Sequence, residues 1–408
     1  MKNLELIGEK GNSSISSHHS EINLPESLAM TKTFDVVIVG GGIFGCYAAM
    51  WLAKQGKRVA LIEKEKALFT KASIVNQARL HGGYHYPRSV ATAVMSDENK
   101  QRFTDEHREF INFSFEKYYA IDRYGSFTDA RQFERFCDFI DIKCEKVENH
   151  PLFNFTHLDA LYLTEEYSFD PILIANHYRS GVLSFDNIQV FTSHQIQNAD
   201  KSGKDWVIRL TDLETGLSKK MEAPAVINAT YCASNAINRL FGFGSIPLMH
   251  EISEMVFIHS PQFKDKGLTV MDGPFASMMP YGKSGLLSLS SVAYTHHKVS
   301  YDDLPSFECQ QQNLNCRPEF TSNCNDCAAK PVSAKNKMMA QIRQYLSEQV
   351  ELNYFSSFYT IKSKLKANAI DDGRPTEIAV LGKSPDFYCL FAGKINSIYE
   401  IEKAMPLQ

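Results

Sequence analysis

The chain has 408 residues, of which 44% are hydrophobic and 22% are charged, and its formal net charge is −4. This length exceeds one ordinary hydrophobic core and predicts two domains. The small net charge and the scattered Lys and Arg residues argue against a nucleic-acid partner, and no apolar stretch is long enough for a membrane span.

The first segment, residues 1–33, is polar and lacks the apolar core of a secretory signal, so we expect a disordered tail. The chain contains nine cysteines, and in a long chain without such a signal they are expected to be reduced thiols. Both features predict a cytoplasmic protein.

Residues 35–63, DVVIVGGGIFGCYAAMWLAKQGKRVALIE, predict a strand, a helix and a second strand. Gly40, Gly42 and Gly45 form a G-x-G-x-x-G turn between strand and helix. The first glycine allows the turn, the second lets the backbone approach a pyrophosphate, and the third lets helix and strand touch. Glu63, at the end of the second strand, can accept hydrogen bonds from a ribose. The pattern therefore predicts an ADP-containing cofactor, either FAD or NAD.

The next segment, residues 64–89, is too polar for a core strand and rich in chemically active residue types. Arg79 and His81 have the same parity, so an extended backbone directs them to one side. Tyr84 and His85 then add hydrogen-bonding groups and aromatic faces. We expect this segment to contribute to the active site.

Further elements follow from hydrophobic periodicity. Helices are expected at residues 91–113, 129–140, 170–183 and 335–352, and a last helix is expected after Gly393. Strands are expected at residues 117–124, 187–191, 206–210, 225–228, 356–367 and 387–391. Residues 246–300 alternate between apolar and polar side chains and predict antiparallel strands.

Four cysteines lie together in a polar insertion, residues 305–330: Cys309, Cys316, Cys324 and Cys327. Four thiols match the ligand count of a structural zinc site. The first two are spaced too widely for a zinc knuckle, whereas the last two form C-x-x-C. We therefore expect free thiols and no metal, with zinc as the alternative.

Three features follow one another in the order seen in one known family. They are the glycine turn with Glu63, the segment that contains Ser73 and Asn76, and the His-Gly-Gly-Tyr stretch that begins at His81. In this respect the chain resembles the D-amino-acid-oxidase-like FAD-dependent oxidoreductases, over residues 34–402. The resemblance implies an α/β fold in which a Rossmann-like FAD-binding domain is interleaved with a substrate domain. The implied substrate domain is built on a mixed, largely antiparallel β-sheet. The implied boundaries are 34–110, 160–240 and 370–408 for the FAD-binding domain, and 111–159 and 241–369 for the substrate domain.

The same resemblance implies which residues bind FAD. They are Gly40, Gly42, Ile43, Phe44, Gly45, Glu63, Lys64, Ser73, Asn76, Gln77, Arg79, Gly393, Lys394, Ile395 and Asn396. The chain departs from the family at Tyr231, where glycine is usual. In one branch of the family a histidine at the His81 position carries the flavin covalently, whereas most relatives bind FAD noncovalently.

A flavin supplies the redox chemistry, so the protein mainly positions the substrate. His81 and His85 are the candidate bases because imidazole titrates near neutral pH. Arg88 and Arg374 are candidate partners of a substrate carboxylate. Arg374 is accordingly placed with the catalytic residues, and Arg88 with Tyr84 and Tyr281 as substrate contacts. Met278, Met279 and Tyr294 are candidates for the pocket wall or for the sheet core.

The resulting expectation is an FAD-dependent oxidoreductase that oxidises a CH–NH or CH–OH bond by hydride transfer to flavin N5. The substrate is expected to be small and anionic, such as an amino acid, an amine or a hydroxy acid, and the electron acceptor is undefined. The alternatives are an NAD-dependent dehydrogenase and a non-catalytic binding protein stabilised by flavin or zinc.

Overall fold

The structure is a computed structural model and describes residues 32–85, 87–88, 90, 99–366 and 377–405. The candidate catalytic residue Arg374 and most of the expected tail lie outside the described residues. The last two residues of that expected tail form a strand, β1 (Lys32–Thr33), because they pair in parallel with β13 (Ser218–Ala223). This pairing corrects the predicted end of the tail.

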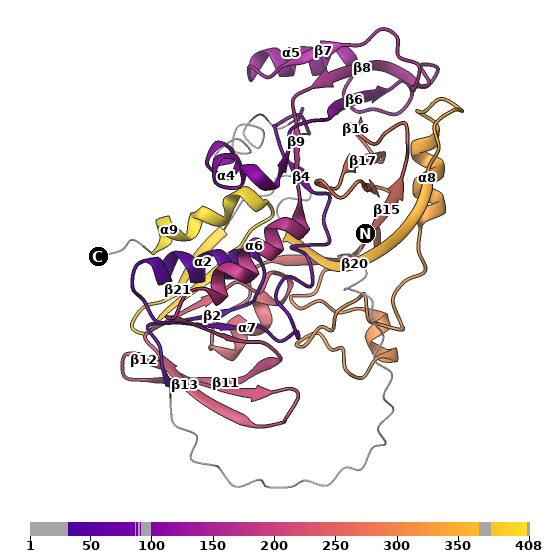
Figure 1. Cartoon of the computed structure of the whole chain (residues 1–408). Helices are drawn as coiled ribbons and strands as arrows, with labels where there is room; N and C mark the ends of the chain where they lie inside the picture. Colours follow the sequence, from indigo (N-terminus) through magenta and orange to yellow (C-terminus); the bar gives the residue numbers. More distant parts are fainter. Residues whose placement is uncertain (1–31, 86, 89, 91–98, 367–376, 406–408) are drawn as a thin grey trace.

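One lobe of the molecule is built on a six-stranded sheet (Figure 1). In order across the sheet its strands are β10 (Ile188–Phe191), β3 (Val59–Ile62), β2 (Val36–Val39), β14 (Ala225–Asn228), β22 (Asp386–Phe391) and β21 (Glu377–Gly382). All neighbours pair in parallel except β21, which is antiparallel to β22. The central strands are apolar because parallel sheets are covered on both faces. The predicted Rossmann-like sheet is therefore confirmed.

Helices and a small sheet cover the two faces of this six-stranded sheet. Helix α2 (Ile43–Lys54) packs with α6 (Pro171–Leu183) in the core on one face. The side chain of Asp170 caps α6 by accepting hydrogen bonds from two backbone N–H groups of its first turn. The other face packs against β12 (Asp205–Asp212) of a four-stranded sheet, through Trp206 and neighbouring aromatic rings.

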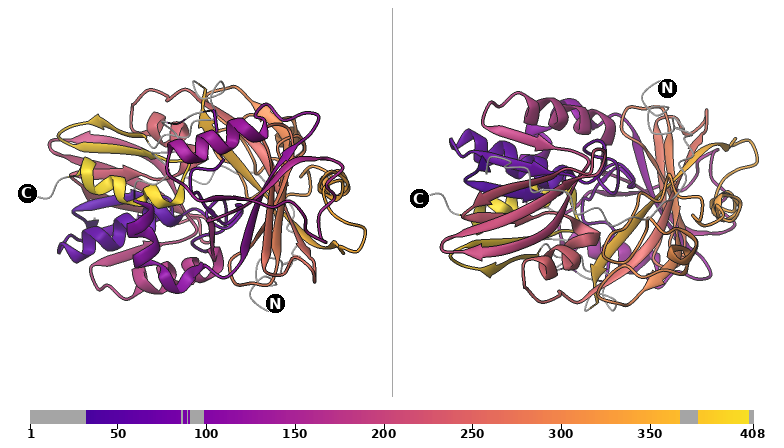
Figure 2. Two further views of the ribbon diagram at one scale, coloured as in Figure 1. Left: turned by 90° about the horizontal axis from the view of Figure 1, so that it is seen from above. Right: turned by 90° about the horizontal axis from the view of Figure 1, so that it is seen from below.

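The second lobe is a nine-stranded mixed sheet, seen beside the first lobe in both views of Figure 2. In order across the sheet its strands are β19 (His296–Ser300), β15 (Leu248–His259), β18 (Leu287–Ser291), β17 (Ala276–Pro280), β16 (Lys266–Met271), β6 (Glu116–Asp122), β8 (Leu158–Thr164) and β7 (Cys144–Lys146), with β20 (Asn353–Leu365) paired to β15. Only β16 and β6 pair in parallel. The largely antiparallel sheet predicted for the substrate domain is confirmed. After the predicted domains, we call the lobe with the six-stranded sheet the FAD-binding lobe and the lobe with the nine-stranded sheet the substrate lobe.

The chain passes repeatedly between the two lobes. A three-stranded sheet of β4 (Arg79–Leu80), β9 (Tyr167–Phe169) and β5 (Ile111–Asn112) lies on this path. The strands of the two large sheets alternate in blocks along the sequence, as Figure 1 shows by colour. The predicted boundaries of the two domains stay a prediction.

Three expected helices differ from the prediction at their ends. Helix α8 (Lys335–Arg343) ends early because Tyr345 and Leu346 turn into the core of the substrate lobe, where Leu346 pairs with Phe153. Of the predicted helix 91–113, residues 91–98 lie outside the described residues, and α4 (Lys100–Glu106) is followed by a 3₁₀ turn (Arg108–Phe110) and by β5. After Gly393 a 3₁₀ turn (Ile395–Tyr399) precedes the short helix α9 (Glu400–Ala404).

Within the described part of the chain, no helix is long and apolar enough to cross a membrane.

Candidate active site

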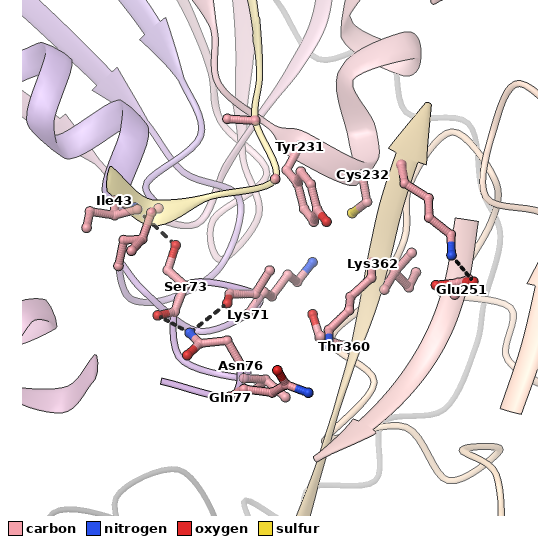
Figure 3. Close-up of a pocket in the computed structure, with 18 of the residues that line it drawn as sticks. Ile43, Lys71, Ser73, Asn76, Gln77, Tyr231, Cys232, Glu251, Thr360 and Lys362 are labelled. Carbon is pink, nitrogen blue, oxygen red and sulfur yellow. Dashed lines mark hydrogen bonds and ion pairs between the residues drawn. The ribbon is translucent and has the colours of Figure 1, made fainter. Parts of the chain in front are cut away.

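A cavity of about 860 Å³ is lined by residues of both lobes. Figure 3 shows Ile43, Ser73 and Asn76 of the FAD-binding lobe on one side and Thr360 and Lys362 of strand β20 facing them. Many of the predicted site residues line this cavity: Gly40, Gly42, Ile43, Phe44, Glu63, Lys64, Ser73, Asn76, Gln77, Arg79, His81, His85, Arg88, Gly393, Lys394 and Ile395. Gly45 and Asn396 are outside the lining.

The glycine turn has no room for side chains. Gly40 adopts φ +108°, and a Cβ there would lie 2.6 Å from the carbonyl oxygen of Ala229. A Cβ on Gly45 would lie 1.9 Å from the carbonyl oxygen of Gly40, so Gly45 supports the turn from behind. The N-terminus of α2 thus approaches the cavity as bare backbone, which fits a diphosphate.

Two side chains orient the surroundings of this turn. The Oγ of Ser73 accepts a hydrogen bond from the backbone N–H of Ile43 at 3.1 Å. The carboxylate of Glu63 accepts hydrogen bonds from the N–H groups of Gly41 at 2.7 Å and Glu65 at 2.9 Å. Glu63 is therefore fixed at the end of β3, where an acid can bind a ribose.

Asn76 and Gln77 line the same side of the cavity but also serve their own loop. The side-chain amide of Asn76 donates to the carbonyl oxygens of Ala72 and Ser73, and its oxygen accepts from the N–H of Ala78. Gln77 donates to the hydroxyl of Ser290 on β18. The bond from Gln77 therefore ties the cofactor side of the cavity to the substrate lobe, whereas the bonds of Asn76 stabilise its own loop.

Arg79 is buried and turns its guanidinium toward the substrate lobe. Its Nη2 donates to Thr269 Oγ1 at 2.8 Å and to Ser277 Oγ at 2.6 Å. Its Nε lies 3.5 Å from a carboxylate oxygen of Glu166, whose side chain is fully buried. Lys117 is also fully buried and donates to Thr269 Oγ1. Burial, together with the charge of Arg79, holds the pKa of Lys117 well below its usual value.

This buried cluster holds the loop that carries the two candidate histidines. Glu166 accepts a hydrogen bond from the N–H of Gly82 at 3.3 Å and from the hydroxyl of Tyr119 at 2.9 Å. Nη1 of Arg79 lies 3.3 Å from Nδ1 of His85. Because a guanidinium only donates, Nδ1 of His85 accepts, and the hydrogen of the neutral ring is on Nε2.

His81 and His85 lie together at this end of the cavity, with ring centroids 5.9 Å apart. Arg88 follows at the rim, where its guanidinium pairs with the carboxylate of Asp272 through Nε and Nη2. The exposed ring of Phe127 lies 5.5 Å from the same guanidinium. The predicted histidines and Arg88 therefore share one region.

Two predicted substrate contacts are corrected by the structure. Tyr84 is buried outside the cavity lining, and its hydroxyl donates to the carbonyl oxygen of Lys143 at 2.7 Å. Tyr281 is also buried, and its hydroxyl donates to the carbonyl oxygen of Ile74 at 2.7 Å. Both hydroxyls satisfy backbone carbonyls and both rings pack in the core, as do Met278 and Met279.

Tyr231, the departure from the family pattern, adopts φ +56°, a left-handed conformation that favours glycine. Its ring stacks on Phe391 at 5.5 Å, and its hydroxyl donates to the carbonyl oxygen of Ser363 at 2.9 Å. These contacts compensate the backbone strain and fasten the turn after β14 to β20.

The cysteines of the insertion show no metal site. Among the residues described, no group of three or more His, Cys, Asp or Glu side chains is arranged to hold a metal ion. All four thiols are free, and only Cys324 lines the cavity. The structure therefore offers no zinc site to support the alternative reading of this segment.

Several lining residues were missed from the sequence. On β20 the alternate residues Thr360, Lys362 and Lys364 line the cavity, as the period of two of a strand allows, and Ile361 between them also lines it. Glu251 on β15 lies 2.9 Å from Nζ of Lys364 and 3.1 Å from His296. Strand parity on β20 was the available signal, but the sequence did not show which face of this strand meets the cavity.

The glycine turn, the fixed acid and the shared cavity define the site of a dinucleotide-binding protein with a separate substrate lobe. The chain matches the family model described as "FAD dependent oxidoreductase" over residues 35–317. This match covers more than half of the chain, so the protein belongs to that family: it is an FAD-dependent oxidoreductase, and its cofactor is FAD. The choice between FAD and NAD that the glycine motif left open is thereby decided.

Individual relatives agree with this assignment. The FAD-dependent monooxygenase FPY4 of Fusarium mangiferae is 24% identical over 365 residues, which cover 89% of this chain and 87% of that protein. Among solved structures, glycerophosphate oxidase of Mycoplasma pneumoniae with FAD bound superposes with a TM-score of 0.65 at 16% identity, covering 91% and 94% of the two chains. Glycine oxidase of Geobacillus kaustophilus gives 0.63 at 16% identity, covering 90% and 91%. At these identities the structures support the fold.

Proposed function

We propose that this enzyme oxidises a CH–NH or CH–OH bond of a small anionic molecule. The observation that carries the proposal is the presence of His81 and His85 in the same cavity as the FAD-binding residues. When bound, FAD would supply the redox chemistry. The other tasks fall to side chains of this protein, namely orienting the substrate, binding its charge and handling its proton.

The two histidines would divide the work of proton handling. Arg79 holds Nδ1 of His85 as an acceptor, so the neutral His85 ring presents an N–H donor at Nε2. In this role His85 would donate a hydrogen bond to the oxygen of an alcohol substrate, or to the nitrogen of an amine once that nitrogen has lost its extra proton. His81 would then accept the proton from an alcohol or ammonium group.

The charge of the cavity wall supports an anionic substrate. Among the described residues, seven Lys and Arg residues line the cavity, against four Asp and Glu residues. Two of the cations, Arg79 and Lys71, are paired with Glu166 and Glu65, which lie outside the lining. The lining cations are Lys64, Lys71, Arg79, Arg88, Lys362, Lys364 and Lys394, and the lining acids are Glu63, Glu251, Asp272 and Glu319. The diphosphate of FAD would take part of this excess. At the rim, Arg88 would share its guanidinium between Asp272 and a substrate carboxylate or phosphate.

The test is an anaerobic titration of the purified holoenzyme, recorded as a visible spectrum. The panel contains amino acids, N-methyl amino acids, hydroxy acids and glycerol phosphate, each paired with its uncharged analogue. We expect one anionic compound to bleach the flavin band and its uncharged analogue to do so far more weakly. Equal bleaching by both would remove the anionic requirement, and a flavin that no member of the panel reduces would refute the proposed substrate class.

A second candidate activity is a monooxygenase, favoured by the name of the Fusarium relative that aligns with 89% of this chain. The two activities differ in the fate of oxygen. An oxidase releases hydrogen peroxide, whereas a monooxygenase places one oxygen atom in the product. Turnover under ¹⁸O₂ with mass analysis of the product distinguishes them, because label in the product identifies the monooxygenase.

A further inference from the structure

The cysteine-containing insertion, residues 305–330, reaches the cofactor side of the cavity. Consecutive residues of it line the cavity, and we call this stretch the covering segment: Glu319, Phe320, Thr321, Ser322, Asn323 and Cys324. None of them belongs to the glycine motif or to the C-terminal segment that the family resemblance associates with FAD. The covering segment is therefore a wall of the cavity that the expected FAD residues do not include.

Two lysines of the FAD-binding lobe fasten the covering segment. Nζ of Lys64 donates to the carbonyl oxygen of Thr321, and Nζ of Lys71 donates to the same oxygen at 3.2 Å. Lys71 also pairs with Glu65 at 2.8 Å. Thr321 is itself buried, so these bonds form a closed contact between the lobe and the insertion.

The position of the two lysines shows which part of the cofactor site is covered. Lys64 directly follows Glu63, the acid placed for the ribose. Lys71 lies two residues before Ser73, whose hydroxyl binds the N–H of Ile43 at the start of α2. The carbonyl that both lysines bind therefore lies beside the residues that serve the ribose and the diphosphate.

The ring of Phe320 lies at this same point, with Nζ of Lys64 4.3 Å from its centroid. Burial, followed by the charge of Lys71, lowers the pKa of Lys64 to about 8. Lys64 occupies one face of the ring, and because Phe320 lines the cavity, a planar purine would pack on the part of the ring that the lysine leaves uncovered.

The far end of the covering segment is held by the substrate lobe. Cys324 packs into an apolar cluster with Cys232 and with Tyr359 of β20. The next residue, Asn325, accepts a hydrogen bond from the N–H of Tyr359 at 2.7 Å. The covering segment is therefore attached to both lobes and spans the cofactor side of the cavity between them.

We propose that the covering segment is part of the FAD site and closes over the ADP half of the cofactor, with Phe320 as its principal side-chain contact. FAD then enters and leaves only when the contact of Thr321 with Lys64 and Lys71 opens. The proposal rests on the FAD cofactor and not on the substrate, so it stands or falls independently of the proposed oxidation.

The test compares Phe320→Ala with Leu314→Ala by FAD fluorescence, which rises when the cofactor dissociates from the diluted holoenzyme. Leu314 lies in the same insertion, is 91% exposed and does not line the cavity. We expect Phe320→Ala to raise the FAD dissociation constant roughly fivefold or more, in line with the loss of an aromatic–base contact, and Leu314→Ala to leave it unchanged. Equal melting temperatures of the two FAD-free variants exclude a folding effect.

A second measurement uses the unmodified chain and decides the matter if Phe320→Ala does not fold. Hydrogen exchange is followed by mass spectrometry on peptides that span residues 316–327, with FAD bound and after FAD removal. We expect bound FAD to slow exchange in the covering segment and to leave residues 212–217, a turn outside the cavity lining, unchanged. Unchanged exchange in the covering segment, or an unchanged dissociation constant in a folded Phe320→Ala protein, would overturn the proposal.

Discussion

The buried pair of Arg79 and Glu166 gives a prediction whose size can be derived from the structure. The substitution Glu166→Gln keeps the shape of the side chain and removes its charge. Nε of Arg79 lies 3.5 Å from the carboxylate, and both side chains are almost completely buried. At an effective dielectric constant of about 20, Coulomb's law gives about 5 kcal/mol at this separation. The uncompensated charge of Arg79 would remain beside the fully buried Lys117.

Loss of one partner of a buried ion pair typically costs about 3–5 kcal/mol, which agrees with the Coulomb figure. We expect Glu166→Gln to lower the free energy of unfolding by this amount, a large part of the roughly 5–15 kcal/mol of an ordinary protein. Arg79→Met should cost a similar amount because it leaves the carboxylate unpaired. The double variant should cost clearly less than the sum, because no uncompensated charge remains.

The assay is urea unfolding of the three variants and the unsubstituted protein, followed by tryptophan fluorescence. Additive costs, or a cost below about 1 kcal/mol for each single variant, would refute the ion pair as a stabilising contact. A second readout concerns His85, because Arg79 fixes its Nδ1 as an acceptor. In ¹⁵N spectra of histidine-labelled protein, the unsubstituted protein should show His85 as one tautomer, with its hydrogen on Nε2. Arg79→Met should show a mixture of the two tautomers, and Arg79→Lys should favour the Nε2–H tautomer only in part.

Two further predictions concern the glycine turn and the response to acid. Gly45→Ala should abolish FAD retention on gel filtration, since its Cβ would lie 1.9 Å from the carbonyl oxygen of Gly40; the control Gly244→Ala, with open space around its Cβ, should retain FAD. Burial raises the pKa of Glu254, but hydrogen bonds, chiefly from His297, outweigh it and hold the pKa at about 2. The unfolded chain, with a carboxyl pKa of about 4.5, then binds protons first, so about 3 kcal/mol of stability present above pH 4.5 should be lost toward pH 2. The check is the urea midpoint, measured between pH 6 and pH 3.5 in the unsubstituted protein and in Glu254→Gln. The midpoint should fall less steeply with acid in Glu254→Gln, and an equally steep fall would contradict this origin of the acid sensitivity.

The cofactor half of the molecule was predictable because its determinants are local. Apolar runs of four or five residues, glycines at fixed spacing and an acid at the end of β3 specify a strand–turn–helix–strand unit without help from distant residues. Helix α8 shows the opposite case. Its sequence continues to favour a helix beyond Arg343, but Tyr345 and Leu346 gain burial only if the chain turns into the core of the substrate lobe. Tertiary packing overrides local propensity there.

In the candidate site, too, features set by the local backbone could be predicted, whereas features set by distant residues could not. Parity in an extended segment predicted that Arg79 and His81 point to one side, and both residues line the cavity; that argument needs only the local backbone. Tyr84 and Tyr281 were misplaced because a tyrosine hydroxyl is as well satisfied by a backbone carbonyl as by a substrate. The partner of a hydroxyl is set by the register of distant strands. For the same reason Lys362 could be assigned to a strand face but not to the cavity.

The two sides of the cavity thus differ in how easily substitutions can change them. Its cofactor side is formed largely by backbone, and at Gly45 almost any side chain is excluded by contact with the carbonyl of Gly40. The side that we propose to be reactive is formed by side chains on a loop that Glu166 and Arg79 tie to the substrate lobe. Substitutions of Thr269 or Ser277, which hold Arg79, should therefore move the histidine loop while leaving the glycine turn in place. Because Arg79 and Glu166 form a buried ion pair, such changes should alter substrate selectivity and stability together.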